Sequence, residues 1–150
     1  MPGDVFGELY LRFMFDVIAR RAGDHLHWGL WSGLPAGGEH FPAARERFAE
    51  HLLSHVPETV RSVIDVGCGL GGIAKSLGEQ GRSVLAVSPR ADHCALMSEA
   101  AFHNVEVRCE SFETLAAEPA DLLLFAESLN FFARDIGAML DRCRAILRPV

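Results

Sequence analysis

Three features are missing from this sequence, and each absence excludes a class of protein. The 150 residues carry no surplus of positive charge, since the net charge is −6 and acidic and basic side chains are interspersed. Nucleic-acid binding needs a basic face, so we expect no nucleic-acid partner. The apolar stretch from Leu9 to Ala19 is too short for a bilayer span or a signal peptide, and Arg12 and Asp16 interrupt it. We therefore expect a cytoplasmic protein with no membrane partner.

Closely spaced cysteines are the third missing feature. The sequence has four cysteines and no CxxC pair: Cys68, Cys94, Cys109 and Cys143. We interpret them as reduced thiols, which is consistent with a cytoplasmic location. Two histidine pairs, His25 with His27 and His51 with His55, could ligate zinc, but no cysteine or carboxylate cluster completes either site. We therefore expect no metal.

From residue 58 onward the sequence contains an alternation of strand-like and helix-like runs. The strand-like runs are Ser62–Val66, Ser83–Val87, Val105–Cys109 and Asp121–Phe125, and the helix-like runs are Gly72–Glu79, Ala91–Ala101 and Arg134–Leu147. Such alternation is typical of βαβ units in a parallel sheet, so the predicted fold class is α/β. No strand-like run follows Asp121–Phe125, so we expect a second copy or another chain to cover the outer edge of that strand.

The first part of the sequence has a different pattern. Helical periodicity runs over residues 5–21, and Pro42 can open a second helix that ends before Pro57. We predict that residues 1–57 form a helical cap on a core of residues 58–150, within one structural domain.

The segment from Asp65 to Gly71 (DVGCGLG) lies between a strand-like run and a helix-like run. Glycines at such a turn let the backbone approach a ligand, and the helix start offers free N–H groups. Three interpretations stay open. The turn could be a dinucleotide site, where Ser88 and Arg90 would meet the ribose phosphate of NADP. It could bind nothing, or it could bind S-adenosylmethionine, whose ammonium group Asp65 would face.

Six segments extend this pattern along the chain: His25–Trp31, Val63–Gly71, Val84–Arg90, Val105–Leu115, Ala120–Ser128 and Ala145–Pro149. In order and spacing they resemble the motifs of class I S-adenosylmethionine-dependent methyltransferases that act on small molecules. The resemblance implies a Rossmann-like parallel sheet of strand order 3-2-1-4, truncated after its fourth strand, with an N-terminal helical cap. It also implies S-adenosylmethionine as the cofactor and methyl transfer to a small-molecule acceptor.

The same resemblance implies where parts of the cofactor would lie. The glycine-rich turn would surround the methionine part, and the residues after the second and third strands would meet the ribose and the adenine. The residues after the fourth strand would line the floor near the methyl group, and two aromatic residues would fold over the cofactor. The residues around the methionine part would be Asp65, Gly67, Cys68, Gly69 and Gly71, and those near the ribose would be Ser88 and Pro89. Ser111 and Phe112 would meet the adenine, and Ala126 and Glu127 would line the floor. The two aromatic residues would be Tyr10 and Trp28. No catalytic residue is implied, and Glu127 and His27 are candidates only.

Departures from the family pattern leave two other functions open. Ser88 and Ser111 stand where the family usually has acidic side chains, so charge-assisted hydrogen bonds to the ribose and adenine are lost. The family's fifth to seventh strands have no counterpart in the sequence. One alternative is therefore a catalytically silent methyltransferase-like module that acts as a partner subunit. The other is an NADP-binding oxidoreductase.

Overall fold

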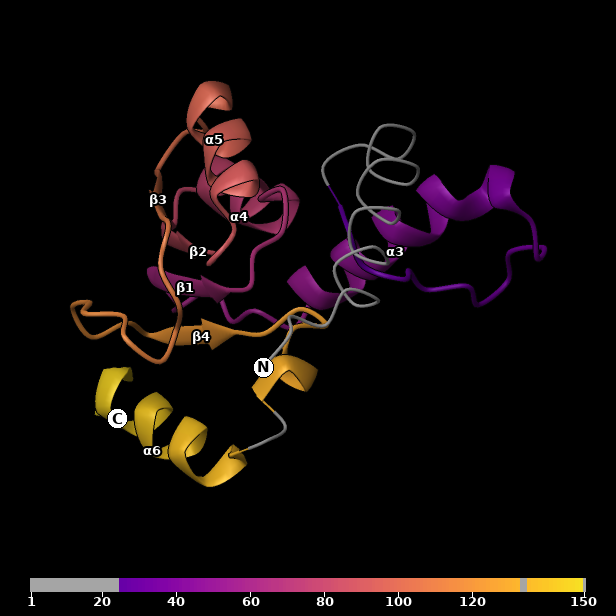
Figure 1. Ribbon diagram of the computed structural model, residues 1–150. Coiled ribbons are helices and arrows are strands. Elements are labelled where there is room, and N and C mark those ends of the chain that lie inside the picture. The colour runs from indigo at the N-terminus through magenta and orange to yellow at the C-terminus, as the bar shows by residue number, and fades with distance from the viewer. Residues whose placement is uncertain (1–24, 133–134, 150) are drawn as a thin grey trace, which may run out of the picture.

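The computed structural model describes residues 25–132 and 135–149, and its centre is a parallel sheet of four strands (Figure 1). The strands are β1 (Ser62–Val66), β2 (Ser83–Val87), β3 (Val105–Arg108) and β4 (Leu122–Leu124). Their order is β3-β2-β1-β4, which confirms the predicted order 3-2-1-4. The inner strand β1 aligns Ile64 with Leu85 of β2 and with Leu123 of β4.

The helices occupy the segments between the strands, close to the predicted bounds. They are α3 (Phe41–Leu53), α4 (Gly72–Glu79), α5 (Ala91–Ala100) and α6 (Ile136–Ile146), with the short 3-10 helices η2 (Gly38–His40) and η3 (Leu129–Phe132). Helix α6 begins at Ile136 because the side chain of Asp135 accepts a hydrogen bond from the backbone N–H of Ala138. The predicted helix over residues 5–21 and the predicted cofactor contact Tyr10 lie outside the described residues.

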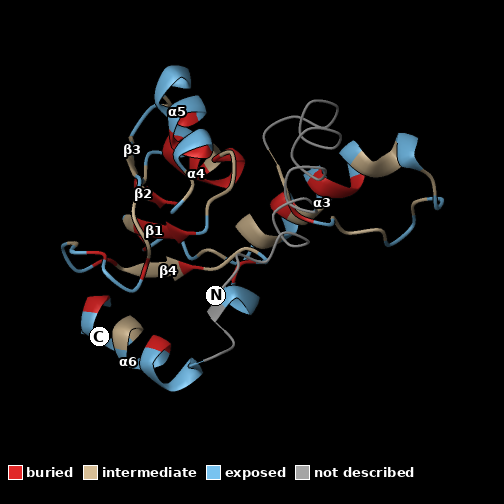
Figure 2. Cartoon of the chain, in the orientation of Figure 1, coloured by how far each residue is buried: buried red, intermediate tan, exposed pale blue. Residues whose placement is uncertain are grey.

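Two apolar clusters fill the two faces of the sheet because successive strand residues point to opposite sides. On one face, Val63 and Ala86 pack with residues of α4 and α5, including Leu77 and Met97. On the other face, Ile64 packs with a second cluster: Val66, Val87, Phe112, Leu115, Ala120, Met139 and Ile146. Figure 1 shows α4 and α5 on one side of the sheet and α6 on the other, and Figure 2 shows that the inner strands are mostly buried.

Helix α3 is attached to the first cluster by its C-terminal half. Ala49 is buried in that cluster, and Leu52, Leu53 and Val56 pack against it. In Figure 1 the helix extends away from the sheet, and Figure 2 shows exposed residues at its far end. The division into a cap of residues 1–57 and a core of residues 58–150 stays a prediction.

The chain returns to the outer side of β4 after α6. The N–H of Ala120 donates to the carbonyl of Ile146 (3.0 Å), and the N–H of Arg148 donates to the carbonyl of Ala120 (2.9 Å). The guanidinium of Arg148 also contacts Asp121 at 2.6 Å. These contacts form a parallel bridge between Ala120 and Leu147 just before β4 begins. Within the described part of the chain, Leu122–Leu124 has no second neighbouring strand.

Candidate functional site

The glycine-rich turn leaves the carboxyl end of β1, beside the point where the strand order reverses between β1 and β4. Ligands of open α/β sheets bind at such a point. Gly67 and Gly71 have φ angles of 72° and 82°, which side-chain-bearing residues rarely adopt. The N–H groups of Gly67 and Cys68 both donate to the carbonyl of Val87, at 2.9 and 3.2 Å, so the turn is tied to the end of β2.

Close packing around the turn also leaves no room for a side chain at two of its glycines. A methyl group on Gly67 would lie 2.6 Å from Cβ of Ser128, which follows β4. A methyl group on Gly71 would lie 2.7 Å from Sδ of Met97 on α5. The thiol of Cys68 also contacts Met97, with 3.8 Å between the sulfur atoms. The turn thus brings the ends of β1 and β4 and the start of α4 close together.

Asp65 lies near the end of β1, two residues before Gly67, and is only 1% exposed. Neither of its carboxylate oxygens has a hydrogen-bond partner in the described part of the chain. Burial raises the pKa of Asp65 from 3.8 to about 7, because removal from water disfavours the charged form. An unpaired buried carboxylate is costly, and a cationic ligand group would lower that cost. The chemistry of this position therefore fits an ammonium group.

The residues after β2 form a tight turn. Ser88 is buried, its Oγ accepts the N–H of Arg90 at 3.2 Å, and its own N–H donates to the carbonyl of Arg108 at 3.1 Å. The next residue, Pro89, is exposed. The hydroxyl of Ser88 thus already has one partner within the turn, and the ribose contact of Ser88 and Pro89 stays a prediction.

The residues after β3 divide between surface and core. The hydroxyl of Ser111 lies 3.2 Å from that of Thr114. The ring of Phe112 is buried and packs edge-on against Phe125, with 5.4 Å between the ring centroids. Phe112 therefore belongs to the second core cluster. The adenine contact of Ser111 and Phe112 stays a prediction.

The residues after β4 face the glycine-rich turn. Ala126 packs against the first core cluster. Glu127 is exposed and has a φ angle of 56°, unusual for a residue with a side chain. Its Oε2 accepts the backbone N–H of Trp28 at 2.8 Å, while the indole of Trp28 is 54% exposed. The structure therefore brings two predicted site residues, Glu127 and Trp28, into direct contact although 99 positions separate them.

His27 precedes Trp28 in the chain and is buried. It is 7% exposed, and neither ring nitrogen has a hydrogen-bond partner within residues 25–132 and 135–149. Its ring packs against Phe48 at a centroid distance of 4.4 Å. Burial first, and then the nearby His25 and Arg45, lower the pKa of His27 to about 3. Its imidazole is therefore neutral at pH 7 and a weak base, which argues against His27 as a general base.

The sequence analysis did not identify Arg45, whose side chain binds the backbone of the segment that contains His27. Arg45 is 1% exposed on α3. Its Nε donates to the carbonyl of His27 at 2.8 Å, and its Nη1 donates to the carbonyl of His25 at 2.6 Å. Its guanidinium lies 4.3 Å from the ring centroid of Phe41. The available signal was its spacing, because Arg45 lies four residues from both Phe41 and Ala49, on the apolar face of the helix.

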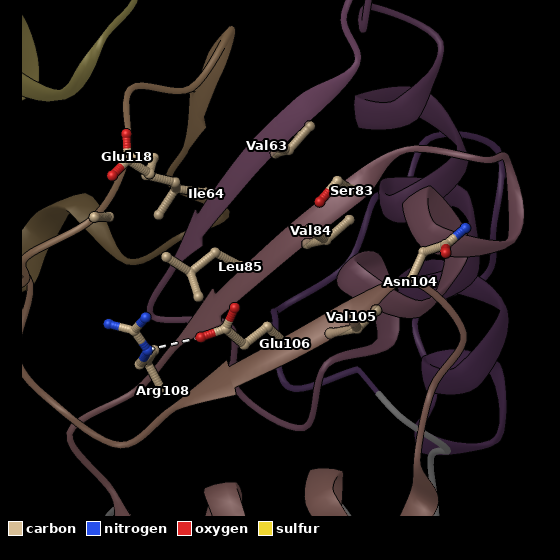
Figure 3. Close-up of a pocket in the computed structure, with 11 residues that line it drawn as sticks. Val63, Ile64, Ser83, Val84, Leu85, Asn104, Val105, Glu106, Arg108 and Glu118 are labelled. Carbon is tan, nitrogen blue, oxygen red and sulfur yellow. Dashed lines mark hydrogen bonds and ion pairs between the residues drawn. The ribbon is translucent and has the colours of Figure 1, made fainter.

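A pocket of about 440 Å³ lies over β1, β2 and β3 (Figure 3). It is lined by Leu85, by the Glu106–Arg108 ion pair (2.8 Å) and by residues at the strand starts such as Ser83. Of the predicted site residues that the structure describes, none lines it, so we do not assign it to the cofactor.

The described histidine, cysteine and acidic side chains form no group of three or more that could hold a metal ion. None of the helices in residues 25–132 and 135–149 combines the length and apolar character that crossing a membrane requires.

Comparison with known proteins identifies the family. A family profile described as "Methyltransferase domain" matches residues 63–150, which is more than half of the chain. The chain belongs to the class I S-adenosylmethionine-dependent methyltransferases. S-adenosylmethionine is the cofactor of this family. The matched range begins in β1 and includes the glycine-rich turn, α4, α5, β4 and α6.

The relatives of this methyltransferase-family chain agree with that assignment. It is 34% identical over 91 residues to a ubiquinone biosynthesis O-methyltransferase from Nitrobacter winogradskyi, covering 58% of the chain and 34% of the relative. The chain thus spans about a third of the length of the curated relatives it matches.

Solved structures show the same fold. A Galdieria sulphuraria protein assigned as a sarcosine dimethylglycine methyltransferase matches with a TM-score of 0.76 and 23% identity, covering 95% of the chain and 56% of that protein. The glycopeptide N-methyltransferase MtfA, solved in complex with S-adenosylmethionine, matches with a TM-score of 0.59 and 14% identity, covering 67% of the chain and 49% of MtfA. The Rossmann-like methyltransferase sheet is therefore confirmed.

Proposed function

We propose that this chain binds S-adenosylmethionine and supplies the cofactor site for methyl transfer to a small-molecule acceptor. The observation that carries the proposal is Asp65, two residues before the first glycine of the turn: its carboxylate is buried and has no hydrogen-bond partner among the described residues. A phosphate-binding turn has no use for a negative charge there, whereas the ammonium group of S-adenosylmethionine would be attracted to it. The family assignment supports this cofactor rather than NADP.

The residues of the site would act by binding and orienting. When bound, S-adenosylmethionine would supply a methyl group on a positively charged sulfur. An acceptor atom would form a bond to that methyl group in line as the methyl–sulfur bond breaks, and the neutral thioether would leave. Holding the two reactants in line provides much of the rate. Asp65 would bind the ammonium group of the cofactor. The turn from Gly67 to Gly71 would let the methionine part lie close to the backbone. The exposed Glu127 would face the methyl acceptor. His27 is poorly suited to take the proton that a hydroxyl acceptor would lose, because its imidazole is weakly basic, so that proton would pass to water.

The acceptor is proposed to be a small molecule that offers an oxygen atom. The curated relatives that support this are O-methyltransferases by name. The match to these relatives covers about a third of their length.

Calorimetric titration tests the cofactor proposal directly. S-adenosylmethionine is expected to bind with micromolar affinity, and NADP is expected not to bind. Asp65→Ala should abolish binding, whereas Asp141→Ala, at an exposed position on α6, should leave the affinity unchanged. Binding of NADP alone would favour the oxidoreductase alternative, and undiminished binding by the Asp65 variant would refute the role of the carboxylate.

A second candidate function is a silent module that binds a partner chain. The observation that favours it is the outer edge of β4, where Leu122–Leu124 has no second strand beside it in the described part of the chain. Unpaired strand edges are templates for pairing with another chain. Light scattering of the purified protein would show a dimer or larger assembly if this edge joins two copies, and a monomer at all concentrations would exclude that version.

A further inference from the structure

The guanidinium of Arg45 connects a helix to a distant segment through two hydrogen bonds. One donor reaches the carbonyl of His27 and another reaches the carbonyl of His25, at 2.8 and 2.6 Å. The two acceptors are alternate carbonyls of the same segment, 18 and 20 positions before Arg45 in the chain. A planar fork of donors suits such a pair, and the single ammonium of lysine does not reproduce it.

The segment held by Arg45 touches both sides of the candidate cofactor site. Leu26 lies over the glycine-rich turn, because a methyl group on Gly69 would be 3.3 Å from its Cδ1. Two residues later, the N–H of Trp28 donates to Oε2 of Glu127 at the end of β4. The segment from His25 to Trp28 therefore bridges the turn after β1 and the loop after β4.

Charge favours the same arrangement. Burial lowers the pKa of Arg45 to about 10, while the nearby Glu127 opposes that change. Arg45 thus keeps its positive charge at pH 7 and attracts Glu127. Because Oε2 of Glu127 is occupied by Trp28, the direction of its exposed carboxylate depends on where the Arg45-bound segment lies.

We propose that Arg45 is a positioning residue of the cofactor site, acting through the segment His25–Trp28 on Gly69 and Glu127. The inference rests on the proposed function, because it concerns the affinity of the same site for S-adenosylmethionine. Arg45 itself does not touch the cofactor in this proposal. It sets the position of Leu26 over the turn and of Trp28 against Glu127.

Arg45→Lys is the variant that tests the proposal, with Arg47→Lys as its matched control. Arg47 lies on the same helix and also donates to a backbone carbonyl, that of Ser32 at 2.7 Å, but it is exposed and its partner lies outside the His25–Trp28 segment. Loss of one charged hydrogen bond from the segment should weaken S-adenosylmethionine binding by about tenfold in calorimetry. The Arg47 variant should stay within about twofold of the unmodified protein.

A stability control separates positioning from simple support of the fold. Ala49→Gly removes a methyl group from the core on the same helix, so it should lower the melting temperature and leave the affinity unchanged. Equal affinities of the Arg45→Lys and Ala49→Gly variants would overturn the proposal. If the unmodified protein itself fails to bind S-adenosylmethionine, the proposed function fails instead.

Hydrogen exchange on the unmodified protein provides a test that needs no variant. Addition of S-adenosylmethionine should slow amide exchange in the segment 25–28, and Trp28 in particular, because the cofactor would lie against the elements that the segment bridges. Binding without any change of exchange in this segment would overturn the proposal, even if Arg45→Lys does not fold.

Discussion

Asp65 combines a buried position with an ionisable group, and this makes the stability of the protein depend on pH. Its pKa is raised from 3.8 to about 7 in the folded state. Between these two values the folded form holds a proton that the unfolded form has lost. The free energy of unfolding therefore falls as the pH rises through that window, and the full destabilisation by the buried carboxylate is reached above about pH 7.

Asp65→Asn is therefore expected to stabilise the ligand-free protein at pH 8. A shift from 3.8 to about 7 corresponds to about 4 kcal/mol at pH values above both, and this sets the upper bound of the gain. Urea unfolding of both proteins at pH 5 and pH 8 measures it. His27 contributes in the opposite direction, because its lowered pKa makes acid destabilising below pH 6.5. The difference between the two proteins isolates Asp65, and an equal difference at both pH values would contradict this account.

The cysteines should differ in reactivity according to their burial. Burial raises the pKa of Cys68, and burial together with a hydrogen bond to Cys109 raises the pKa of Cys94 to about 11. Since the thiolate is the reactive form, both should react slowly at pH 8. Cys109 is exposed and should be alkylated first. Mass spectrometry of peptides during a time course with iodoacetamide would measure the order, and early labelling of Cys68 would contradict it.

At the scale of the elements, sequence pattern predicted the inner strands and α4 to the residue. Both inner strands are short apolar runs bounded by polar or glycine residues, and Gly72–Glu79 follows the glycine-rich turn directly. The outer strand β4 is shorter than the predicted run. Its first predicted residue, Asp121, instead accepts the N–H groups of Arg61 and Ser62 at 2.8 Å each. Such long-range pairing leaves no periodic signal in the sequence.

Sequence pattern likewise identified the contiguous part of the candidate site and missed the contacts between distant segments. The glycine-rich turn and Asp65 are contiguous in sequence, so their spacing could be recognised. Arg45 could not be assigned a role, because its partners are backbone carbonyls that any sequence would supply. The contact of Trp28 with Glu127 likewise depends on tertiary structure alone.

Alanine substitution of two helical glycines should change the free energy of unfolding in opposite directions. A methyl group on Gly78 of α4 would overlap the carbonyl oxygen of His103, which is a backbone atom and not the end of a flexible side chain. Among the described residues, a methyl group on Gly137 of α6 would meet Asp135 Oδ1 alone, at 3.5 Å. Alanine is a better helix former than glycine by about 1 kcal/mol. Gly137→Ala should therefore raise the free energy of unfolding by up to that amount, while Gly78→Ala should lower it by about 1–3 kcal/mol. Urea unfolding would measure both, and a stabilised Gly78 variant would contradict the packing described.

At the scale of the whole molecule, protection from solvent should decrease outward from β1. This strand is paired on both sides, with β2 and with β4. The outer strands β3 and β4 each have one partner strand in the described part of the chain. Amide exchange is expected to be slowest in β1 and faster in the outer two strands. Exchange in β4 as slow as in β1 would instead indicate that its outer edge is covered in solution.

The buried carboxylate of Asp65 should also couple ligand binding to the release of protons into the buffer. With a pKa of about 7, Asp65 is partly protonated in the ligand-free protein at neutral pH. A ligand that places a cation beside it requires the ionised form, so binding would release a fraction of a proton. The heat measured in a titration at pH 7 would then change with the ionisation enthalpy of the buffer. The slope of that dependence would count the protons that each binding event returns to solution.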